Sequence, residues 1–221
     1  MKPIKSMFNS YSPFYVNPLV GPGLWGWLCR FALNCNAKKA LHSASARSLL
    51  LQSSMTLYKE LFAKENIECE FQEKGLLFAH VEEKSLEHYS RTNDFLTKEF
   101  GISAKRYDSA GIVALEPALK DTVVGGWHYE DDAHLRPDKL MSELKRVLLA
   151  MDVQIVENCS VESFNRQGSK ISSVKTNQGE MAFDKLLLAT GALAPKLAKE
   201  LGVKLHIQPG KGYSLTTNRP T

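Results

Sequence analysis

The feature that most restricts the fold is a short apolar run near the end of the chain. Leu186, Leu187, Leu188 and Ala189 are followed by Thr190-Gly191, and a helix is predicted from about residue 195. Such a run is typical of a strand buried on both faces, as in parallel sheets covered by helices. Ligands of open α/β sheets lie beyond the carboxyl ends of the strands, so the turn after Ala189 is a candidate binding position. An ordinary strand-to-helix turn explains the same residues equally well.

The front of the chain has helical periodicity instead. Between residues 43 and 64, apolar side chains recur at steps of four, three and four, at Leu51, Met55, Tyr58 and Phe62. A helix presents these four on one face. Further helices are predicted over residues 24–35, from 83 to a stop at Gly101, from 137 to 151 and from about 195.

Strand signals are concentrated in the rear of the chain. Strands are predicted at 75–81, 153–156, 160–164, 170–176, 180–183, 186–189 and 213–216, with turns at 165–168 and 177–179. Residues 1–24 and 107–119 are predicted to be irregular, with a short helical piece near Glu116, and Gly125-Gly126-Trp127 is predicted to open a loop. The fold class that fits is mixed α/β, with a helical front part and a nucleotide-domain-like rear part.

Composition excludes several classes of protein. Apolar residues make up 43% and charged residues 24% of the 221 residues, which is ordinary for a globular protein. The net charge of +4 is scattered and forms no basic stripe, so no nucleic-acid partner is expected. The four cysteines have no CxxC spacing, which favours free, mostly buried thiols in a reducing compartment. No signal peptide and no run of about 18 apolar residues is present.

Two glycine-rich motifs lack the context that phosphate binding requires. Gly21-Pro22-Gly23-Leu24-Trp25-Gly26 has the letters of a dinucleotide fingerprint, but no clean strand precedes it and no acidic residue follows at the ribose position. Loop and helix packing explains it better. Residues 210–212 place a lysine between glycines without the spacing of a P-loop, which favours a simple entry into a strand.

The remaining polar candidates all have an ordinary structural explanation. Glu130, Asp131, Asp132 and His134 have ligand chemistry for a hard metal, but a solvated acidic loop is the better interpretation, so no metal is predicted. No catalytic set is apparent, and Cys159 is expected to be a small core residue. Arg106 and Arg136 are weak candidates for a carboxylate clamp, and Glu116 for a helix cap.

One apolar segment raises the question of a membrane surface. Residues 19–33 contain two tryptophans and Arg30, and Lys38 and Lys39 follow. A helix of this composition can lie on a bilayer. A helix packed in the protein core is the alternative.

Several segments, in this order, resemble one family: the small-subunit class of bacterial D-amino acid dehydrogenases, within the FAD-dependent D-amino acid oxidase and glycine oxidase superfamily. The resemblance is strongest in the rear. It is carried by Lys5-Ser6-Met7-Phe8, Ser12-Pro13, Trp25 to Cys35, Gly75-Leu76-Leu77, Leu115-Glu116-Pro117-Ala118, Gly125-Gly126, Val161, Leu186 to Gly191, Leu201-Gly202-Val203, Pro209 and Lys211 to Thr216.

This resemblance implies an FAD-binding Rossmann-like domain and a substrate domain with a mixed sheet. Residues 1–135 would belong to the substrate domain, 136–200 to the FAD domain, and 201–221 to the return to the substrate domain. The backbone at Val161 would contact the adenine end of FAD, and Ala189, Thr190 and Gly191 would line the cofactor near its phosphates. A D-amino acid would lose a hydride from its α-carbon to flavin N5, and a quinone or respiratory acceptor would take the electrons.

The resemblance also has departures. The family's N-terminal GxGxxG strand and its substrate-binding arginine have no counterpart in the chain, so an interior fragment is expected that binds FAD weakly and does not turn over substrate alone. His134-Leu135-Arg136-Pro137 is closer to the glycine-oxidase-like branch. Three alternatives stay open: a glycine or sarcosine oxidase, a 2-hydroxy acid dehydrogenase, or a non-catalytic remnant that serves as a binding or structural module. A cytoplasmic location is expected, with peripheral contact to the inner face of the plasma membrane as an open alternative.

Overall fold

The structure, a computed structural model, describes residues 22–168 and 170–214. The chain divides into two compact units. Unit 1 comprises residues 1–39 and 156–221, and unit 2 comprises residues 40–155. The predictions for residues 1–21 and 215–216 lie outside the described residues. The assignment of 1–135 and 201–221 to a substrate domain and of 136–200 to an FAD domain stays a prediction.

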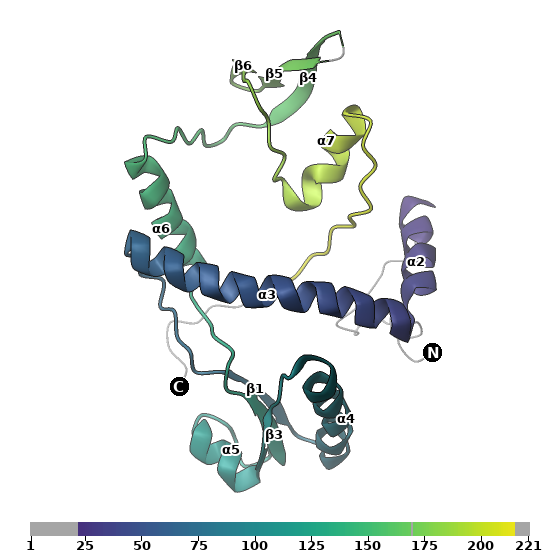
Figure 1. Cartoon of the computed structure of the whole chain (residues 1–221), viewed down its shortest axis with the longest axis vertical. Helices are drawn as coiled ribbons and strands as arrows, with labels where there is room; N and C mark the ends of the chain where they lie inside the picture. Colours follow the sequence, from purple (N-terminus) through teal and green to yellow (C-terminus); the bar gives the residue numbers. More distant parts are fainter. Residues whose placement is uncertain (1–21, 169, 215–221) are drawn as a thin grey trace. The chain divides into compact units, whose positions relative to one another are not determined.

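Unit 2 contains a three-stranded antiparallel sheet with the strand order β1-β3-β2. Its strands are β1 (Leu76–His80), β2 (Lys105–Asp108) and β3 (Gly125–Tyr129). The helices α4 (Glu83–Phe100) and α5 (Ser109–Leu115) lie on opposite sides of it (Figure 1). The predicted strand at 75–81 and the helix from 83 are therefore confirmed, whereas β2 was not predicted.

The alternation of side chains along β3 explains why both faces are covered. Trp127 and Tyr129 point to one face and pack with Leu86 of α4, which is only 2% exposed. The Trp127 indole N–H donates to the Leu86 carbonyl at 3.3 Å. Gly126 belongs to the other face, against Ile112 of α5. One central strand thus joins two small apolar layers.

The prediction that Gly125-Gly126-Trp127 opens a loop is wrong, because these residues begin the central strand. A Cβ atom on Gly126 would lie 2.3 Å from Ile112 Cδ1 and 2.5 Å from the Phe78 carbonyl oxygen. Glycine is needed here for the close approach of α5 and β1 to β3, and not for a turn. Sequence alone does not distinguish these two uses of glycine.

A second apolar core in unit 2 joins α3 (Ala37–Glu65) to α6 (Pro137–Ala150). It contains five buried side chains, namely Phe62, Ile67, Cys69, Leu140 and Val147. The Arg146 guanidinium donates to the carbonyls of Glu65 and Asn66 at 3.0 and 3.2 Å, which caps the end of α3. Both helices were predicted, including the proline at the start of α6.

Unit 1 contains α2 (Pro22–Asn34), an antiparallel three-stranded meander, a 3-10 turn η1 (Gly191–Leu193) and α7 (Ala194–Glu200). The meander strands are β4 (Val161–Gln167), β5 (Lys170–Thr176) and β6 (Gly179–Ala182), in the order β4-β5-β6. The three predicted strands and the turn at 177–179 are confirmed. The turn predicted at 165–168 is shorter than expected, because β4 continues to Gln167.

Two predicted strands, at 153–156 and 186–189, are absent. Neither segment pairs with another strand among the described residues, and their apolar side chains are solvent-exposed, 42% at Val153 and 88% at Leu187. A strand needs a neighbour for its backbone hydrogen bonds, so an apolar run alone does not form one. Residues 213–214, at the start of another predicted strand, are irregular as well.

The cysteines and the helices bear on two further expectations. All four cysteines are free as predicted, but Cys29 and Cys35 are exposed, Cys159 is half-buried and only Cys69 is buried, so the expectation of mostly buried thiols is wrong. No helix in residues 22–168 and 170–214 is both long and apolar enough to cross a membrane. The mixture of helix and sheet agrees with the predicted fold class.

We expect Gly126→Ala to destabilise unit 2 by about 1–3 kcal/mol, because the added methyl group overpacks the contact with Ile112 and Phe78. Urea unfolding followed by circular dichroism measures the change. Gly210→Ala, where an added Cβ has open space, is the matched control and should stay within about 0.5 kcal/mol. Ile112→Val should recover part of the loss in the double variant. An unchanged midpoint for Gly126→Ala would contradict the packing argument.

Candidate functional site

Unit 2 contains a cavity of about 800 Å³ between α3, the end of α4 and residues 131–135. Leu51, Met55 and Tyr58 form its wall on α3, which is the helical face that the sequence predicted. The fourth member of that face, Phe62, continues into the buried core between α3 and α6. The helix therefore offers one apolar stripe, which is partly core and partly cavity wall.

The end of α4 supplies a second apolar wall with Phe100 and Ile102. Gly101 between them has a left-handed backbone with φ of 68°. Its N–H donates to the Thr97 carbonyl at 3.0 Å, and the Ile102 N–H donates to the Leu96 carbonyl at 3.3 Å. This conformation is favoured by glycine and ends the helix, so that Phe100 and Ile102 both reach the cavity. The predicted stop at Gly101 is confirmed.

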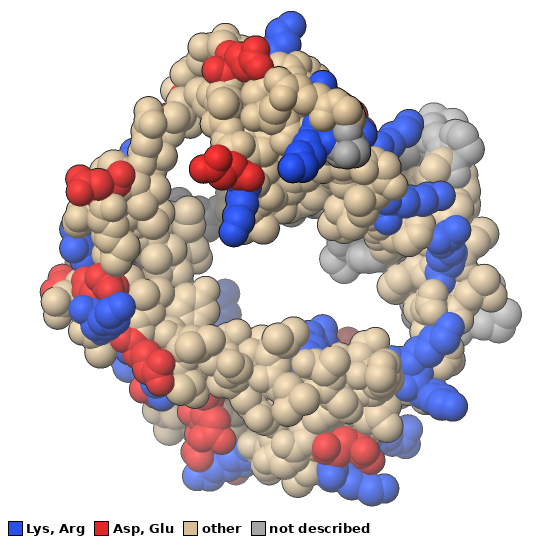
Figure 2. Space-filling view, turned by 45° about the horizontal axis from the view of Figure 1, so that its top comes forward, with Lys and Arg blue, Asp and Glu red and all other residues tan. Residues whose placement is uncertain are grey.

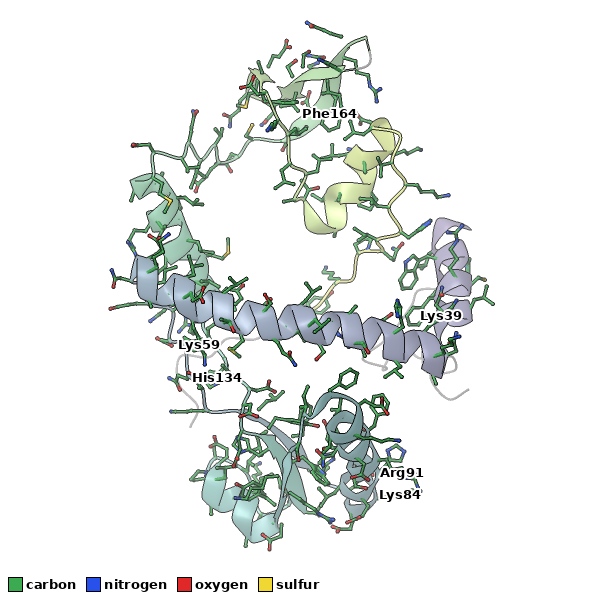
Figure 3. The ribbon with its side chains drawn as sticks, viewed as in Figure 1. Lys39, Lys59, Lys84, Arg91, His134 and Phe164 are labelled. Atoms are coloured by element: carbon green, nitrogen blue, oxygen red, sulfur yellow. The ribbon has the colours of Figure 1, made fainter. Side chains whose placement is uncertain are left out.

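Charged side chains of both signs also line this cavity. Arg47 lies one turn before Leu51 on α3, while Asp131, Asp132 and His134 come from the loop after β3. The loop is held by backbone hydrogen bonds: Gly75 N–H donates to the Asp132 carbonyl at 2.9 Å, and Gln72 and His134 exchange two bonds of 2.9 and 3.0 Å. Figure 3 labels His134 on this segment.

This combination suits a particular class of ligand. A guanidinium binds a carboxylate, carboxylates bind an ammonium group, and the apolar walls take hydrocarbon. Arg47 was not predicted as a site residue, although Arg47, Leu51 and Met55 follow one another at steps of four on the predicted helical face. The described residues include no group of three or more His, Cys, Asp and Glu placed to hold a metal.

The other arginines considered from the sequence are held by local ion pairs. Arg106 binds the Glu87 carboxylate and lies over the Trp127 ring, 5.9 Å from its centroid. Arg136 donates two hydrogen bonds to Asp138, which holds the pKa of that carboxyl below its usual value. Glu116 is the C-terminal capping residue of α5, as expected.

The four predicted cofactor residues lie in unit 1. Val161 is the first residue of β4, Ala189 and Thr190 lie in irregular chain, and Gly191 begins η1. The structure gives no hydrogen bond between Val161 and residues 189–191 in the described part of unit 1. The strand β4 and the helix α7, which follow or contain these positions, are joined by a hydrogen bond from the Arg166 side chain to the Glu200 carbonyl.

The backbone of Val161 faces the open edge of the meander. Asn177 N–H donates to the Ser160 carbonyl, and the next pair in register is Val161 with Thr176. Hydrogen-bonded and non-hydrogen-bonded pairs alternate in an antiparallel ladder, so we infer that the N–H and C=O of Val161, just before the register shift between Val161 and Ser163, point away from β5. One donor beside one acceptor, with no partner given among the described residues of unit 1, would match the amino group and ring nitrogens of an adenine edge.

Gly191 is the second position that fits a large cofactor. Its φ is 52°, a conformation that side chains with a Cβ adopt rarely, and a Cβ built there would meet no atom within 4 Å. The backbone at Thr190-Gly191 is therefore open to close approach by a ligand. Both positions are compatible with the predicted flavin contacts, which stay predictions.

A polar network crosses the meander that carries Val161. Asn165 of β4 donates to Ser173 Oγ at 3.1 Å and to Glu180 Oε1 at 2.8 Å, and Ser173 Oγ donates to the same carboxylate oxygen. Ser173 is almost fully buried. These donors, Ser173 foremost, hold the pKa of the Glu180 carboxyl below its usual value. The network links all three strands.

Comparisons with known proteins agree with the predicted family. A sequence model of the family described as DAO, FAD dependent oxidoreductase, matches residues 23–221. The chain is 26% identical over 219 residues to a D-amino acid dehydrogenase of Granulibacter bethesdensis, which is 98% of this chain and 52% of that protein. For a D-amino acid dehydrogenase of Methylobacterium nodulans, the identity is 29% over 224 residues, with the same coverage of both chains. The chain thus spans about half the length of these curated relatives.

Solved structures agree with the fold. Glycine oxidase from Geobacillus kaustophilus superposes with a TM-score of 0.60 at 20% identity, over 78% of this chain and 45% of that one. Glycine oxidase from Bacillus cereus gives a TM-score of 0.59 at 21% identity, over 74% and 44%. At these identities the similarity establishes the fold alone. The predicted α/β flavoprotein-like fold is confirmed.

We expect the Glu180 carboxyl to titrate below the usual glutamate pKa, and Ser173→Ala to raise its pKa toward the usual value, because the largest stabilising hydrogen bond is lost. Carbon-detected NMR of the side-chain carboxyl measures both titrations. Because the pKa in the folded state is depressed, the stabilisation is present above the unfolded pKa and is lost as pH falls through the folded one. Ser160→Ala is the control, since only its backbone takes part in the meander bonds. An unchanged Glu180 titration in Ser173→Ala would rule out the network.

Proposed function

Because the chain belongs to the family of FAD-dependent oxidoreductases, we propose that it is part of a dehydrogenase that oxidises D-amino acids. The cavity of unit 2 is the structural observation that carries this proposal. It combines Arg47, two aspartates and apolar walls, which complement the carboxylate, the ammonium group and the side chain of an amino acid. The names of the relatives from Granulibacter bethesdensis and Methylobacterium nodulans support the D-amino acid as substrate.

The proposed reaction is an oxidative deamination. Bound FAD supplies the acceptor, flavin N5, for the hydride that leaves the α-carbon of the amino acid. The amino acid becomes an imino acid, and water converts this product to a keto acid and ammonia. The two electrons then pass to a quinone or another respiratory acceptor, as the name dehydrogenase of the relatives suggests.

The residues of this chain would bind and orient. Arg47 would hold the substrate carboxylate, Asp131 and Asp132 the ammonium group, and Met55 and Phe100 the side chain. In unit 1, the backbone edge at Val161 would hold the adenine, and the open backbone from Ala189 to Gly191 would approach the phosphates. We assign none of these residues a role as acid or base.

The length of the chain is part of the proposal. It spans about half of its curated relatives, so we propose that the 221 residues alone bind FAD weakly and do not turn over substrate. We also propose that the protein acts in the cytoplasm, with peripheral contact to the inner face of the membrane that holds the quinone.

We expect the product of the intact gene to oxidise D-alanine or a larger D-amino acid with a quinone analogue as acceptor, and to release one ammonia per two electrons. Glycine, sarcosine and 2-hydroxyglutarate should be poor substrates, and oxygen a poor acceptor. Initial rates with each substrate and acceptor measure this. A preference for glycine as substrate and oxygen as acceptor would contradict the proposal and indicate an oxidase. A preference for 2-hydroxyglutarate would indicate a hydroxy acid dehydrogenase instead. No turnover of any substrate would favour a non-catalytic module.

The role of the cavity is separable in the same assay. Arg47→Gln removes one charge-assisted hydrogen bond to the substrate carboxylate, which corresponds to about a tenfold or larger rise in KM. Arg91→Gln, an exposed arginine on α4 outside the cavity (Figure 3), is the matched control. If both variants keep the same KM, the cavity is not the substrate site, while the activity itself still stands.

We expect Val161→Pro to weaken FAD binding to the intact gene product about tenfold, because proline removes the free N–H at the edge of β4. The meander should remain folded, since this N–H is not used in the ladder and proline is tolerated at the first residue of an edge strand. Flavin fluorescence titration measures the affinity. Val161→Ala keeps the N–H and should change it less than twofold. Equal affinities for the two variants would remove the adenine contact from the proposal.

A further inference from the structure

The unit 2 cavity is much larger than a small amino acid such as D-alanine. Its volume of about 800 Å³ lies in the range of pockets that enclose drug-sized ligands. Arg47 and Tyr58 both line it, and their positions on α3 correspond to a rise of about 16 Å along the helix. A substrate carboxylate held at Arg47 therefore leaves a long stretch of cavity wall for the rest of the substrate.

The part of α3 that follows Arg47 is uncharged. No charged residue stands between Arg47 and Lys59 in the sequence, and uncharged surface, drawn in tan, covers the middle of α3 (Figure 2). Leu51, Met55 and Tyr58 carry the cavity wall along this part, each about one helical turn beyond the last. The methyl group of D-alanine would leave most of this wall in water. A large apolar side chain would cover it, and the gain on binding grows with the apolar area removed from water.

The aromatic side chains near the end of α3 form a wall that exists before any ligand binds. The rings of Tyr58 and Phe71 both pack on the buried Phe62, with ring centroids 5.4 Å apart in each case. The Lys59 ammonium group, labelled in Figure 3, lies 2.5 Å from the Glu73 carboxylate and joins the segment after Phe71 to α3. A ligand therefore does not have to order this wall, which favours binding.

The end of α4 supplies a third aromatic side chain to the cavity. The Phe100 ring packs edge-on against the Phe95 ring, with centroids 6.0 Å apart. Aromatic rings attract one another in offset or edge-on arrangements at about 4.5–7 Å, beyond the effect of the area that they bury. A ring that enters the cavity thus has aromatic partners from both α3 and α4.

We infer that the cavity selects amino acids with a large apolar side chain, and aromatic ones above all. The inference rests on the proposed function, because it takes Arg47, Asp131 and Asp132 as the groups that bind the carboxylate and ammonium ends of the substrate. Met55 and Phe100 are then residues that determine specificity. Burial of a phenylalanine side chain in place of a methyl group corresponds to a preference of about 10- to 100-fold.

The same walls disfavour acidic side chains. A second carboxylate on the substrate would lose its water against the apolar walls, which costs free energy unless a new partner replaces the water. The carboxylates of Asp131 and Asp132 on the cavity would repel it in addition. D-Glutamate should therefore be bound less well than D-alanine, although it is larger.

The kinetic test compares kcat/KM among substrates of the intact gene product, with a quinone analogue as acceptor. We expect D-phenylalanine to exceed D-alanine by about tenfold or more, with D-leucine between them and D-glutamate below D-alanine. 3-Cyclohexyl-D-alanine has a side chain as large as that of D-phenylalanine but no aromatic ring, so it should fall below D-phenylalanine. A preference for D-alanine would overturn the inference, and equal values for the two large side chains would overturn its aromatic part.

A variant that fills the cavity tests the assignment to these residues. Met55→Trp should lower the ratio of kcat/KM for D-phenylalanine over D-alanine about tenfold or more, because the indole occupies the space of the substrate ring. Met141→Trp, at an exposed methionine on α6, is the matched control and should keep the ratio of the parent. A loss of folded protein affects both substrates equally and leaves the ratio unchanged. An unchanged ratio in Met55→Trp would overturn the inference.

Binding to the 221-residue chain separates this inference from the proposed reaction. The residues that line the cavity all belong to unit 2, so an NMR titration without FAD should show D-phenylalanine binding about tenfold or more tighter than D-alanine. Met55→Trp should remove the difference. If it does and the intact gene product oxidises no amino acid, the selectivity stands and the proposed reaction fails. If D-amino acids are oxidised but binding and turnover show no preference, the reaction stands and the inference is overturned.

Discussion

The need of each strand for a hydrogen-bonding neighbour decides which parts of this chain have regular structure. The antiparallel sheets β1-β3-β2 and β4-β5-β6 find their partners within the described residues. Residues 153–156 and 186–189 have the same apolar character, but the described structure offers them no partner, and they stay irregular. In the described structure β4 also lacks a neighbour on its outer side, so it is an edge strand. The exposed backbone at Val161 and the absence of the two predicted strands therefore have the same cause, a missing partner strand.

Local patterns were sufficient for the longer helices and for the meander, but not for α5, since residues 107–119 were expected to be irregular apart from a short helical piece near Glu116. The spacing of Leu51, Met55, Tyr58 and Phe62 predicted α3, and Gly101 predicted the end of α4, because a helix is stabilised by residues three or four positions apart. The strands of the meander are joined by short turns, which the sequence also marks. Gly126 shows the limit. Its role depends on Ile112 and Phe78, which leave no room for a side chain at position 126. These residues are distant in the sequence, so no local pattern predicts this crowding.

The candidate sites show the same limit. The sequence predicted that Asp131, Asp132 and His134 lie in an acidic loop. Arg47 stands more than 80 residues earlier in the chain, and only the folded structure brings it to the same cavity. Its position on the apolar face of α3 was the available signal, since a charged residue in line with Leu51 and Met55 needs a polar environment. Val161 was predicted as a cofactor contact from the family resemblance alone. The pairing of Val161 with Thr176 in the structure gives a physical reason for its backbone to be accessible.

Two chemistries are found on separate parts of the chain. Unit 2 holds charges of both signs on one cavity, which suits a small zwitterion. The meander and the turn at Gly191 offer uncharged backbone, which suits a cofactor bound by hydrogen bonds and close approach. A zwitterion needs charges of both signs at fixed positions, whereas close approach to a cofactor needs backbone that side chains leave uncovered. The proposed substrate contacts and the proposed cofactor contacts therefore involve different residues, so a substitution in one set leaves the chemistry of the other set unchanged.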